Sequence, residues 1–410
     1  MASPPRRIIH FGWALRHRDY RLFFAGQSVS LIGTWIHLTA QAWLVYRLGG
    51  SAEWLGIASF VSQAPMFFLP QFGGVVADRY DRRRVLLLTQ ALSMILALTL
   101  GMLTISHSVC LWHVLVISGL LGIINAFDMP ARHSFVVELV GGPDLANAIA
   151  LNSSVFNGAR LIGPAVAGIA VAALGEAWCF LVNAVTFLAL IAGLLAMRRS
   201  PFAARPRTAT MWRDMRDGIA FAAGTPPIRI LLLLVGTISF FAMPCTVLMP
   251  IFAGDVLGGG SARLGILMSA VGFGAMSGAL ALAARTSIDG YARTIRLVAV
   301  GFAGALILFS QSHWLWLAAV ALVMIGFCQM TLSAASNTLI QSIVPDRYRG
   351  RTMALYTTMF IGMTPFGSLA AGYAASGIGA PATVAVSGLL ALVIAALSWR
   401  RLRDPLGTEK

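Results

Sequence analysis

The chain has 410 residues, of which 58% are apolar and only 11% are charged, and its mean hydropathy is +0.80. This composition excludes a set of soluble domains. Its apolar runs of about twenty residues are long enough to cross about 30 Å of hydrocarbon as helices. A β-barrel is excluded because the runs lack the two-residue alternation of barrel strands. The formal net charge of +15 is strongly basic, and its meaning depends on where the charges lie.

Taken in chain order, the apolar runs predict an all-α membrane protein with twelve transmembrane helices. The expected helices are residues 24–46, 54–77, 85–106, 111–137, 148–174, 177–197, 228–252, 264–284, 294–311, 315–343, 353–375 and 381–399. We predict a six-helix bundle at 1–197 and a second at 228–410, in parallel orientation. Between them, residues 198–227 are expected to form a cytoplasmic linker with a short amphipathic helix.

The basic residues fall almost entirely on one side of this arrangement. Of the 30 Lys and Arg residues, 26 lie in the termini, the linker and alternate turns, whereas Arg47 and Arg263 lie on the other side. Short loops rich in Lys and Arg stay in the cytoplasm. The distribution predicts cytoplasmic N and C termini in a multi-pass protein of a bacterial inner membrane. It gives no support to nucleic acid as a partner.

Two short sequence repeats relate the two predicted six-helix bundles. Residues 48–57 read LGGSAEWLGI and reappear at 257–266 as LGGGSARLGI, in each case in the turn between the first two helices of a half. Pro143-Asp144 is echoed by Pro345-Asp346, after the expected fourth and tenth helices. Parallel repeats of this kind place a substrate site between the halves, near the middle of the bilayer.

The highest concentration of charge lies in the turn after the second expected helix. Residues 74–84 read Gly-Val-Val-Ala-Asp-Arg-Tyr-Asp-Arg-Arg-Arg and carry six charges. This pattern resembles the signature loop of the major facilitator superfamily, with Asp81 where a glycine is usual. The Asp variant resembles the branch of efflux proteins that contains the enterobactin and macrolide exporters.

A second stretch supports that branch, and the resemblance covers all twelve expected helices. It includes Asn-Ala-Phe-Asp-Met-Pro-Ala-Arg at 125–132 and Asn-Gly-Ala-Arg-Leu-Ile-Gly-Pro-Ala-Val-Ala-Gly at 157–168. The resemblance implies the major facilitator fold and transport by alternating access. It also implies that the aspartate equivalent to Asp78 holds the halves together on the inner side when the pocket faces outward.

We therefore expect a conformational latch built from Gly74, Asp78, Arg79 and Arg82. Gly74 is expected to let the second helix approach a neighbour closely. Asp78 is expected to meet a helix N-terminus, whose dipole favours an anion. The alternative is that the arginines of this loop only set the orientation of the protein, and we expect that role for the last two, residues 83–84.

The sequence Gly163-Pro164-x-x-Ala167-Gly168 resembles a motif that, within the superfamily, is associated with exporters rather than importers. Ala167 stands where that motif has its second glycine. Pro164 removes a backbone donor and bends the helix, and the small residues permit close helix crossing. An ordinary proline-kinked packing helix is the alternative reading of this motif.

Charges at membrane depth are expensive and usually functional. Arg160 lies close to the middle of its expected helix, so it requires a partner, a water-filled cavity or an anionic ligand. Asp128 and Arg132 are four residues apart and share one helix face, where a structural ion pair and a gating role are both open. His37 can titrate near neutral pH. We favour Asp128 over His37 as the proton carrier.

The central helices supply candidates for the substrate pocket, since aromatic and Met side chains adapt to varied apolar ligands. The candidates are Trp35, Gln41, Gln63, Asn157, Phe241, Met243, Gln329, Asn337, Met359 and Met363. The four cysteines have neither metal-site nor CxxC spacing, so neither a metal nor a cofactor is expected. The sole lysine is Lys410, which excludes a Walker loop. The energy source is then expected to be an ion gradient, with protons favoured, or the gradient of the substrate itself.

These observations predict a secondary active exporter of a small drug or siderophore-like molecule, working by alternating access as a proton antiporter. Its expected partners are the lipid bilayer and the small-molecule cargo, and it is expected to work as a monomer. A nutrient importer is the alternative within transport. An intramembrane enzyme or a non-transporting sensor is the alternative from another class. The seven His are dispersed, which disfavours the enzyme, and no added soluble domain of the kind that a sensor brings is expected.

Overall fold

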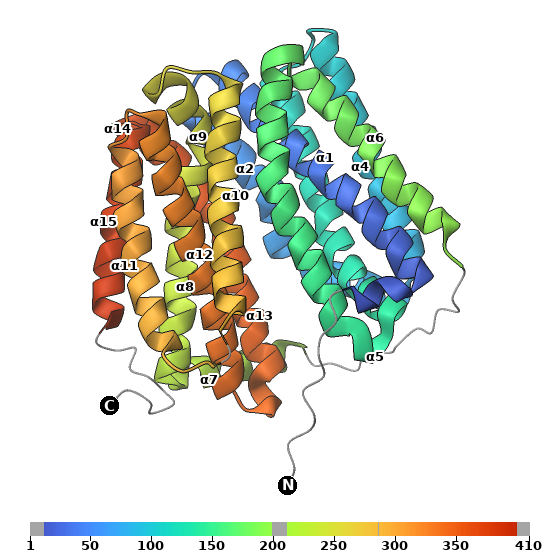
Figure 1. Cartoon of the computed structure of the whole chain (residues 1–410), viewed down its shortest axis with the longest axis vertical. Helices are drawn as coiled ribbons and strands as arrows, with labels where there is room; N and C mark the ends of the chain where they lie inside the picture. Colours follow the sequence, from blue (N-terminus) through green and yellow to red (C-terminus); the bar gives the residue numbers. More distant parts are fainter. Residues whose placement is uncertain (1–11, 199–210, 286, 400–410) are drawn as a thin grey trace.

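A computed structural model describes residues 12–198, 211–285 and 287–399, and this part of the chain is built from helices without a strand (Figure 1). The elements are η1 (Trp13–Arg16), α1 (Arg18–Gly49), α2 (Ala52–Phe68), α3 (Pro70–Arg79), α4 (Arg82–Ile105), α5 (Leu111–Leu174), α6 (Glu176–Ala196), α7 (Met211–Gly224), α8 (Pro226–Val247), α9 (Met249–Ile251), η2 (Phe252–Val256), α10 (Ser261–Ala283), α11 (Tyr291–Ser310), α12 (Leu315–Ile343), α13 (Asp346–Gly362), α14 (Thr364–Ile378) and α15 (Ala380–Trp399). The predicted all-α fold is confirmed.

Eight helices of the described chain are long and apolar enough to cross a membrane. They are α4, α5, α6, α8 with its extension through α9 and η2, α10, α11, α12 and α15. The prediction of a multi-pass membrane protein is thereby confirmed. Each of these helices overlaps one or two of the segments expected from the sequence.

Helix α5 contains two expected segments in one element. The helical conformation is interrupted at Gly141, where φ is 68° and ψ is 179°. A left-handed backbone is open to glycine because it has no Cβ. The expected loop at 138–147 is therefore reduced to a one-residue break between a first arm, 111–140, and a second arm, 142–174.

Two other expected helices are interrupted. The segment 54–77 is divided between α2 and α3 at Leu69, and Pro70 begins the second piece. The segment 353–375 is divided between α13 and α14 at Met363, with Pro365 in the first turn of α14. Proline lacks the N–H that would continue the preceding helix, but its fixed φ suits a new first turn.

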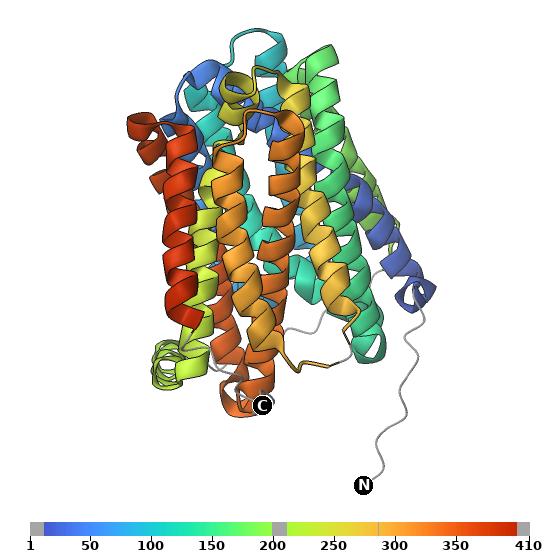
Figure 2. The same cartoon turned by 60° about the vertical axis from the view of Figure 1, so that its left-hand side comes forward.

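Buried apolar side chains gather in separate clusters along the chain. The largest draws nearly all its members from residues 222–395, and three smaller clusters come from residues 14–197. In Figures 1 and 2, α1 and α4–α6 stand together beside a second group that includes α8, α10–α12 and α15. The boundaries of the predicted domains stay a prediction, and residues 199–210 of the linker lie outside the described chain.

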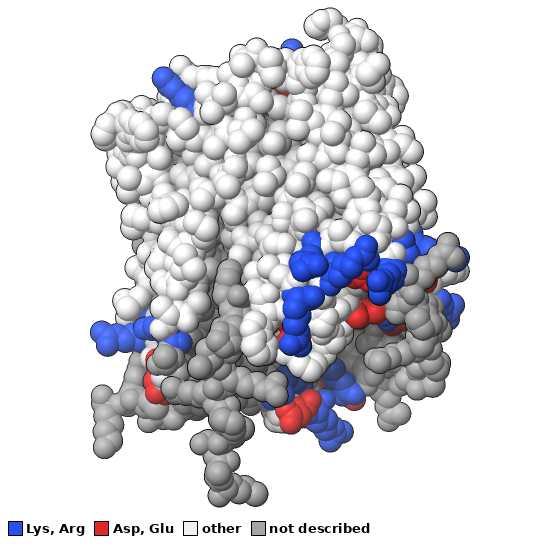
Figure 3. Space-filling view, turned by 45° about the vertical axis from the view of Figure 1, so that its right-hand side comes forward, with Lys and Arg blue, Asp and Glu red and all other residues white. Residues whose placement is uncertain are grey.

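The charged residues mark one end of the molecule. Figure 3 shows arginines gathered toward one end of the molecule. This is the end at which α1 begins and α15 ends (Figure 1). We call this the basic end; it carries the α3–α4 turn and the break at Gly141. The opposite end, here the far end, carries Gly50, Gly175 and residues 257–260.

The predicted linker helix is present as α7 at the basic end. It packs on the start of α13, where the Phe221 and Tyr348 rings stack with centroids 4.2 Å apart. Ala222 is buried and Ile219 is exposed. The side chains of residues 211–215 lie outside the described part of the chain.

Candidate functional site

Contacts within the first half hold the basic turn between α3 and α4. The Asp81 carboxylate caps α4 by accepting a hydrogen bond from the Arg83 backbone N–H at 2.9 Å. Arg82 forms an ion pair with Glu138 of α5 at 3.0 Å. The Arg83 guanidinium donates to the backbone oxygens of residues 194 and 195 at the end of α6. Arg83 therefore ties α4 to α6, a contact that the sequence did not reveal.

The close approach between α3 and α5 is made by Gly73, one residue before the predicted Gly74. A Cβ on Gly73 would collide with the backbone oxygen of Ala126, whereas a Cβ on Gly74 would have nothing within 4 Å. Gly74 makes no such close approach in this structure, because one residue turns the contact about 100° around a helix. Asp78 is half-buried and Arg79 is exposed, and their role as a latch stays a prediction.

Asp128 is the centre of a buried polar cluster on α4, α5 and α1. Its Oδ1 accepts hydrogen bonds from the Thr89 hydroxyl at 2.7 Å and the Gln90 amide at 2.8 Å. Its Oδ2 accepts two from Arg132, at 2.8 and 2.5 Å. Arg132 also donates to Gln27 of α1. The carboxylate is only 5% exposed, and its charge is matched by the guanidinium.

His37 and Gln41 form a second buried network in the first half. The His37 Nε2 lies 3.1 Å from the Gln41 Oε1, and the Gln41 amide donates to the Ser118 hydroxyl at 2.9 Å. The Phe180 ring packs edge-on against the imidazole, with centroids 4.8 Å apart. This packing favours a structural role for His37 over proton transfer, and it places Gln41 inside the bundle.

Arg160 lies over an aromatic ring and has no acidic partner among the described residues. Its Cζ is 5.9 Å from the centroid of the Trp35 ring on α1. Gly163, one turn further along α5, contacts the Cβ of Trp35 and would collide with it if it carried a side chain. The first glycine of the predicted motif therefore positions the aromatic ring beneath Arg160. The Phe156 ring completes this group at 5.9 Å from Trp35.

Glycine pairs bring the two halves into backbone contact near the far end. A Cβ on Gly168 would lie 2.9 Å from the Cα of Gly265, and one on Gly265 would lie 2.6 Å from the backbone oxygen of Pro164. On the other side of the interface, a Cβ on Gly56 would lie 2.8 Å from the Cα of Gly372. Gly56 and Gly265 occupy the same place in the two copies of the repeated sequence, residues 48–57 and 257–266.

A polar cluster beneath one of these crossings links α2 to α14. The Ser59 hydroxyl donates to the Ser368 hydroxyl at 2.9 Å, and the Gln63 amide donates to Ser59 at 2.7 Å. The Thr364 hydroxyl in turn donates to the Gln63 carbonyl at 2.8 Å. Gln63 was predicted as a pocket residue. Its three partners were not, because their small hydroxyls carry no distinctive sequence signal.

A second contact between the halves joins α1 to the π-helical turn η2. The Tyr46 hydroxyl donates to the Asp255 carboxylate at 2.6 Å. Gly254 packs directly against the Tyr46 ring and leaves no space for a side chain. Single π-turns often mark functional sites. The sequence did not predict this one, because a π-turn has no distinctive pattern within an apolar run.

The sequence matches the model of the transmembrane secretion effector family over residues 12–409. The chain belongs to this family. It is a transporter of the major facilitator superfamily rather than an enzyme, and its relatives include siderophore and drug exporters. The prediction of family and of efflux-type relatives is therefore confirmed.

The transporter is similar to several characterised proteins over nearly its whole length. It is 26% identical to the staphyloferrin A transporter of Staphylococcus aureus, over 91% of this chain and 94% of that protein. It is 27% identical to the multidrug efflux pump Tap of Mycolicibacterium fortuitum, over 91% and 93%. It is 25% identical to the enterobactin exporter EntS of Escherichia coli, over 93% and 91%.

Solved transporters share the fold of this chain. A bacterial homologue of the human lysosomal transporter Spinster, in an inward-facing and unoccupied conformation, superposes with a TM-score of 0.71 at 15% identity, over 99% of this chain and 98% of that one. The nucleoside transporter NupG superposes with a TM-score of 0.69 at 13% identity, over 95% and 98%. At sequence identities this low, the comparison shows only that the folds are the same.

The remaining pocket candidates of the transporter lie in both halves. Asn157 is buried and donates to the Ser153 backbone oxygen of its own helix at 2.8 Å. The half-buried candidates are Trp35, Gln63, Phe241, Met243, Gln329, Asn337, Met359 and Met363. Met359 and Met363 pack beside Gly236 of α8. Contact of these side chains with a cargo stays a prediction.

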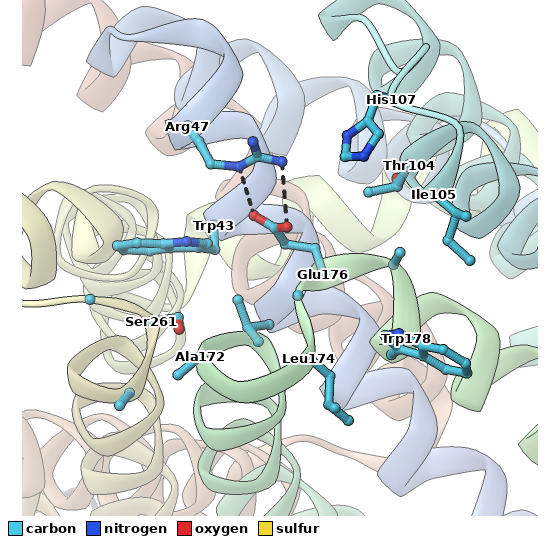
Figure 4. Close-up of a pocket in the computed structure, with 15 residues that line it drawn as sticks. Trp43, Arg47, Thr104, Ile105, His107, Ala172, Leu174, Glu176, Trp178 and Ser261 are labelled. Carbon is cyan, nitrogen blue, oxygen red and sulfur yellow. Dashed lines mark hydrogen bonds and ion pairs between the residues drawn. The ribbon is translucent and has the colours of Figure 1, made fainter.

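An open groove of about 660 Å³ lies at the far end of the transporter, away from those candidates (Figure 4). Helices α1, α4, α5, α6 and α10 contribute its lining, which includes none of the predicted pocket residues. Arg47 donates to Glu176 from two nitrogens, at 2.9 and 3.4 Å. The aromatic rings of Trp43 and Trp178 lie on either side of this pair.

At the basic end, Asp144 anchors η1 of the transporter beside the break at Gly141. Its carboxylate lies 2.8 Å from the His17 ring and 2.7 Å from the Arg16 guanidinium. The hydrogen bond from His17, and after it the charge of Arg16, lowers the pKa of this carboxyl, which lies outside the expected spans. The Ala14 backbone N–H donates to the neighbouring Asn147.

Proposed function

We propose that this transporter is a secondary active exporter that moves a small organic molecule from the basic end to the far end by alternating access. The pair of glycine crossings, Gly168 with Gly265 and Gly56 with Gly372, carries this proposal. Backbones in direct contact leave no room for a cargo to pass. The crossings therefore act as a far-end closure, and the proposed cycle opens them and closes the basic end in turn.

The proposed topology has twelve crossings and a cytoplasmic basic end in a bacterial inner membrane. Besides the eight helices long enough to span alone, α1 crosses once, and α2–α3 and α13–α14 each cross as an interrupted helix. The two arms of α5 count as two crossings. The concentration of arginines at the basic end supports cytoplasmic termini, because short basic loops are retained there. The transporter is proposed to act as a monomer.

The proposed direction and cargo class draw on two kinds of support. Relatives over more than nine-tenths of the chain carry the names of a siderophore transporter, a drug efflux pump and an enterobactin exporter. The motif at residues 163–168 also makes specific contacts, since Gly163 meets Trp35 and Gly168 meets Gly265. A drug or a siderophore-like molecule is therefore the proposed cargo.

Proton antiport is proposed to run through Asp128. Protonation would weaken its two bonds from Arg132 and release the tie from Arg132 to Gln27 on α1. Such a change is local, yet it alters how α1 is held against α5. No acidic residue lies between Phe23 and Tyr46 in α1, which supports a coupling carboxylate elsewhere in the bundle.

Transport into inverted membrane vesicles tests direction and coupling. Tetracycline and enterobactin serve as drug and siderophore probes, and respiration generates an acidic vesicle interior. The exporter is expected to accumulate one of these probes, and a protonophore is expected to abolish the accumulation. Accumulation in right-side-out vesicles alone would identify an importer. Accumulation that survives the protonophore would exclude proton antiport.

A further inference from the structure

We infer that Arg160 anchors an anionic group of the cargo, and that the cargo class is a small amphipathic carboxylate. This inference rests on the proposed transport of an organic molecule between the two halves. It adds the charge that the molecule carries and the residue that recognises it. The argument starts from the difference between the two arginines at membrane depth.

Arg132 and Arg160 both lie on α5, but only one is neutralised. Arg132 forms a two-point pair with Asp128 and donates to Gln27. Among the described residues, no carboxylate or hydrogen-bond acceptor pairs with Arg160, whose recorded contact is the Trp35 ring. A cation at membrane depth is costly unless something compensates it. A ring face compensates only part of the charge.

The position of Arg160 is where a cargo is expected. It is near the middle of the second arm of α5, which packs against α10 of the other half. A Cβ on Gly272 of α10 would lie 2.7 Å from the Arg160 backbone oxygen. The residue therefore stands at the interface that alternating access opens and closes, at the depth at which parallel repeats place their substrate.

The surroundings of Arg160 match a planar anion attached to an apolar body. A contact between a cation and a ring face uses none of the guanidinium N–H groups, so its donors remain for a ligand. Their fork matches the two oxygens of a carboxylate. The adjacent rings of Trp35 and Phe156 offer apolar surface for the rest of the molecule. Gly163 holds Trp35 in place through direct contact with its Cβ.

Two probes that differ in charge but share a ring test the inference. The full-length transporter in lipid nanodiscs is dialysed to equilibrium against 2-naphthoate or 2-naphthamide, with empty nanodiscs to correct for partition into lipid. The wild type is expected to bind the carboxylate at least about tenfold more tightly than the amide. Arg160→Gln is expected to reduce that preference to within about twofold.

Two further variants separate the role of Arg160 from general charge and from misfolding. Arg18→Gln removes a half-exposed arginine at the basic end and is expected to keep the full preference. Arg160→Lys keeps the charge but lacks the planar fork, so an intermediate preference is expected. If Arg160→Gln fails to fold, the intermediate value in Arg160→Lys decides.

A wild type that binds both probes equally would overturn the inference, and so would an unchanged preference in Arg160→Gln or Arg160→Lys. These outcomes are independent of transport direction, because no gradient is present. If the transporter exports a cargo but does not prefer the carboxylate, only the inference about Arg160 is wrong. If it prefers the carboxylate but carries its cargo inward, only the proposed direction of transport is wrong.

Discussion

Asp128 is a buried carboxylate that accepts hydrogen bonds from three side chains, and one of them, Arg132, matches its charge. Removing one member of a buried ion pair leaves the other charge without compensation, which costs more than the pair itself contributes. The cluster thus stabilises the first half, and a cycle driven by its protonation would disturb that half as well.

Asp128→Asn is expected to destabilise the transporter by about 3–5 kcal/mol, because Arg132 is left unpaired. Adding Arg132→Gln removes the uncompensated charge and is expected to recover a large part of this loss. Thermal unfolding of the purified single and double variants measures both effects. Additive losses in the double variant would contradict the proposed pairing.

Gly73 and Gly74 offer a matched pair of substitutions at neighbouring positions. Gly73→Val places a side chain against the backbone of Ala126, whereas Gly74→Val enters open space. The Gly73 variant is expected to be less stable than the Gly74 variant by about 1–3 kcal/mol, from overpacking alone. Thermal unfolding again provides the measurement. Equal stability would show that α3 and α5 do not cross at Gly73.

At the scale of helices, the far-end closure depends on small residues on both partners. Gly168 of α5 meets Gly265 of α10, and Gly56 of α2 meets Gly372 of α14. Lines of small residues let membrane helices approach through their backbones. Any side chain added at such a crossing pushes two helices, and with them two halves, apart.

Gly168→Val is expected to hold the far end open and to slow transport. Gly158→Val is the control, since a Cβ on Gly158 has nothing within 4 Å. In a Cys110→Ser background, Gln63→Cys beneath the closure reports far-side access by reaction with an impermeant maleimide. The Gly168 variant is expected to speed this reaction several-fold. An unchanged reaction rate would show that the crossing does not close the pathway.

The sequence predicted the helices better than the contacts between them. Apolar runs located the spans, and the loop expected at 138–147 contains the one-residue break at Gly141. The break at Leu69 was not foreseen, because a single-residue interruption leaves the apolar run intact. The polar link from Ser59 to Ser368 joins residues 309 positions apart. Which helix faces which across the interface depends on tertiary packing, so residue type alone cannot reveal it.

At the scale of the whole molecule, charge placement predicts the orientation. A green fluorescent protein fused after Lys410 is expected to fluoresce, and alkaline phosphatase fused at the same place is expected to be inactive, since both report a cytoplasmic C terminus. Phosphatase fused after Gly50 on the far-end turn is the positive control. An active phosphatase at the C terminus would reverse the proposed orientation.

Alternating access requires the two ends of the molecule to move in opposite senses. Distances between spin labels in nanodiscs measure both ends in one protein. Ser108→Cys and Ala382→Cys report the far end, and both sites are exposed. Arg84→Cys and Asp346→Cys report the basic end, with side chains 85% and 86% exposed.

Each label pair is expected to show two populations, and any condition that lengthens the far-end distance, such as acidification or added cargo, is expected to shorten the basic-end distance. Gly168→Val is expected to favour the population with the long far-end distance. Two ends that stay fixed, or that lengthen and shorten together, would contradict the alternating exporter proposed for this chain.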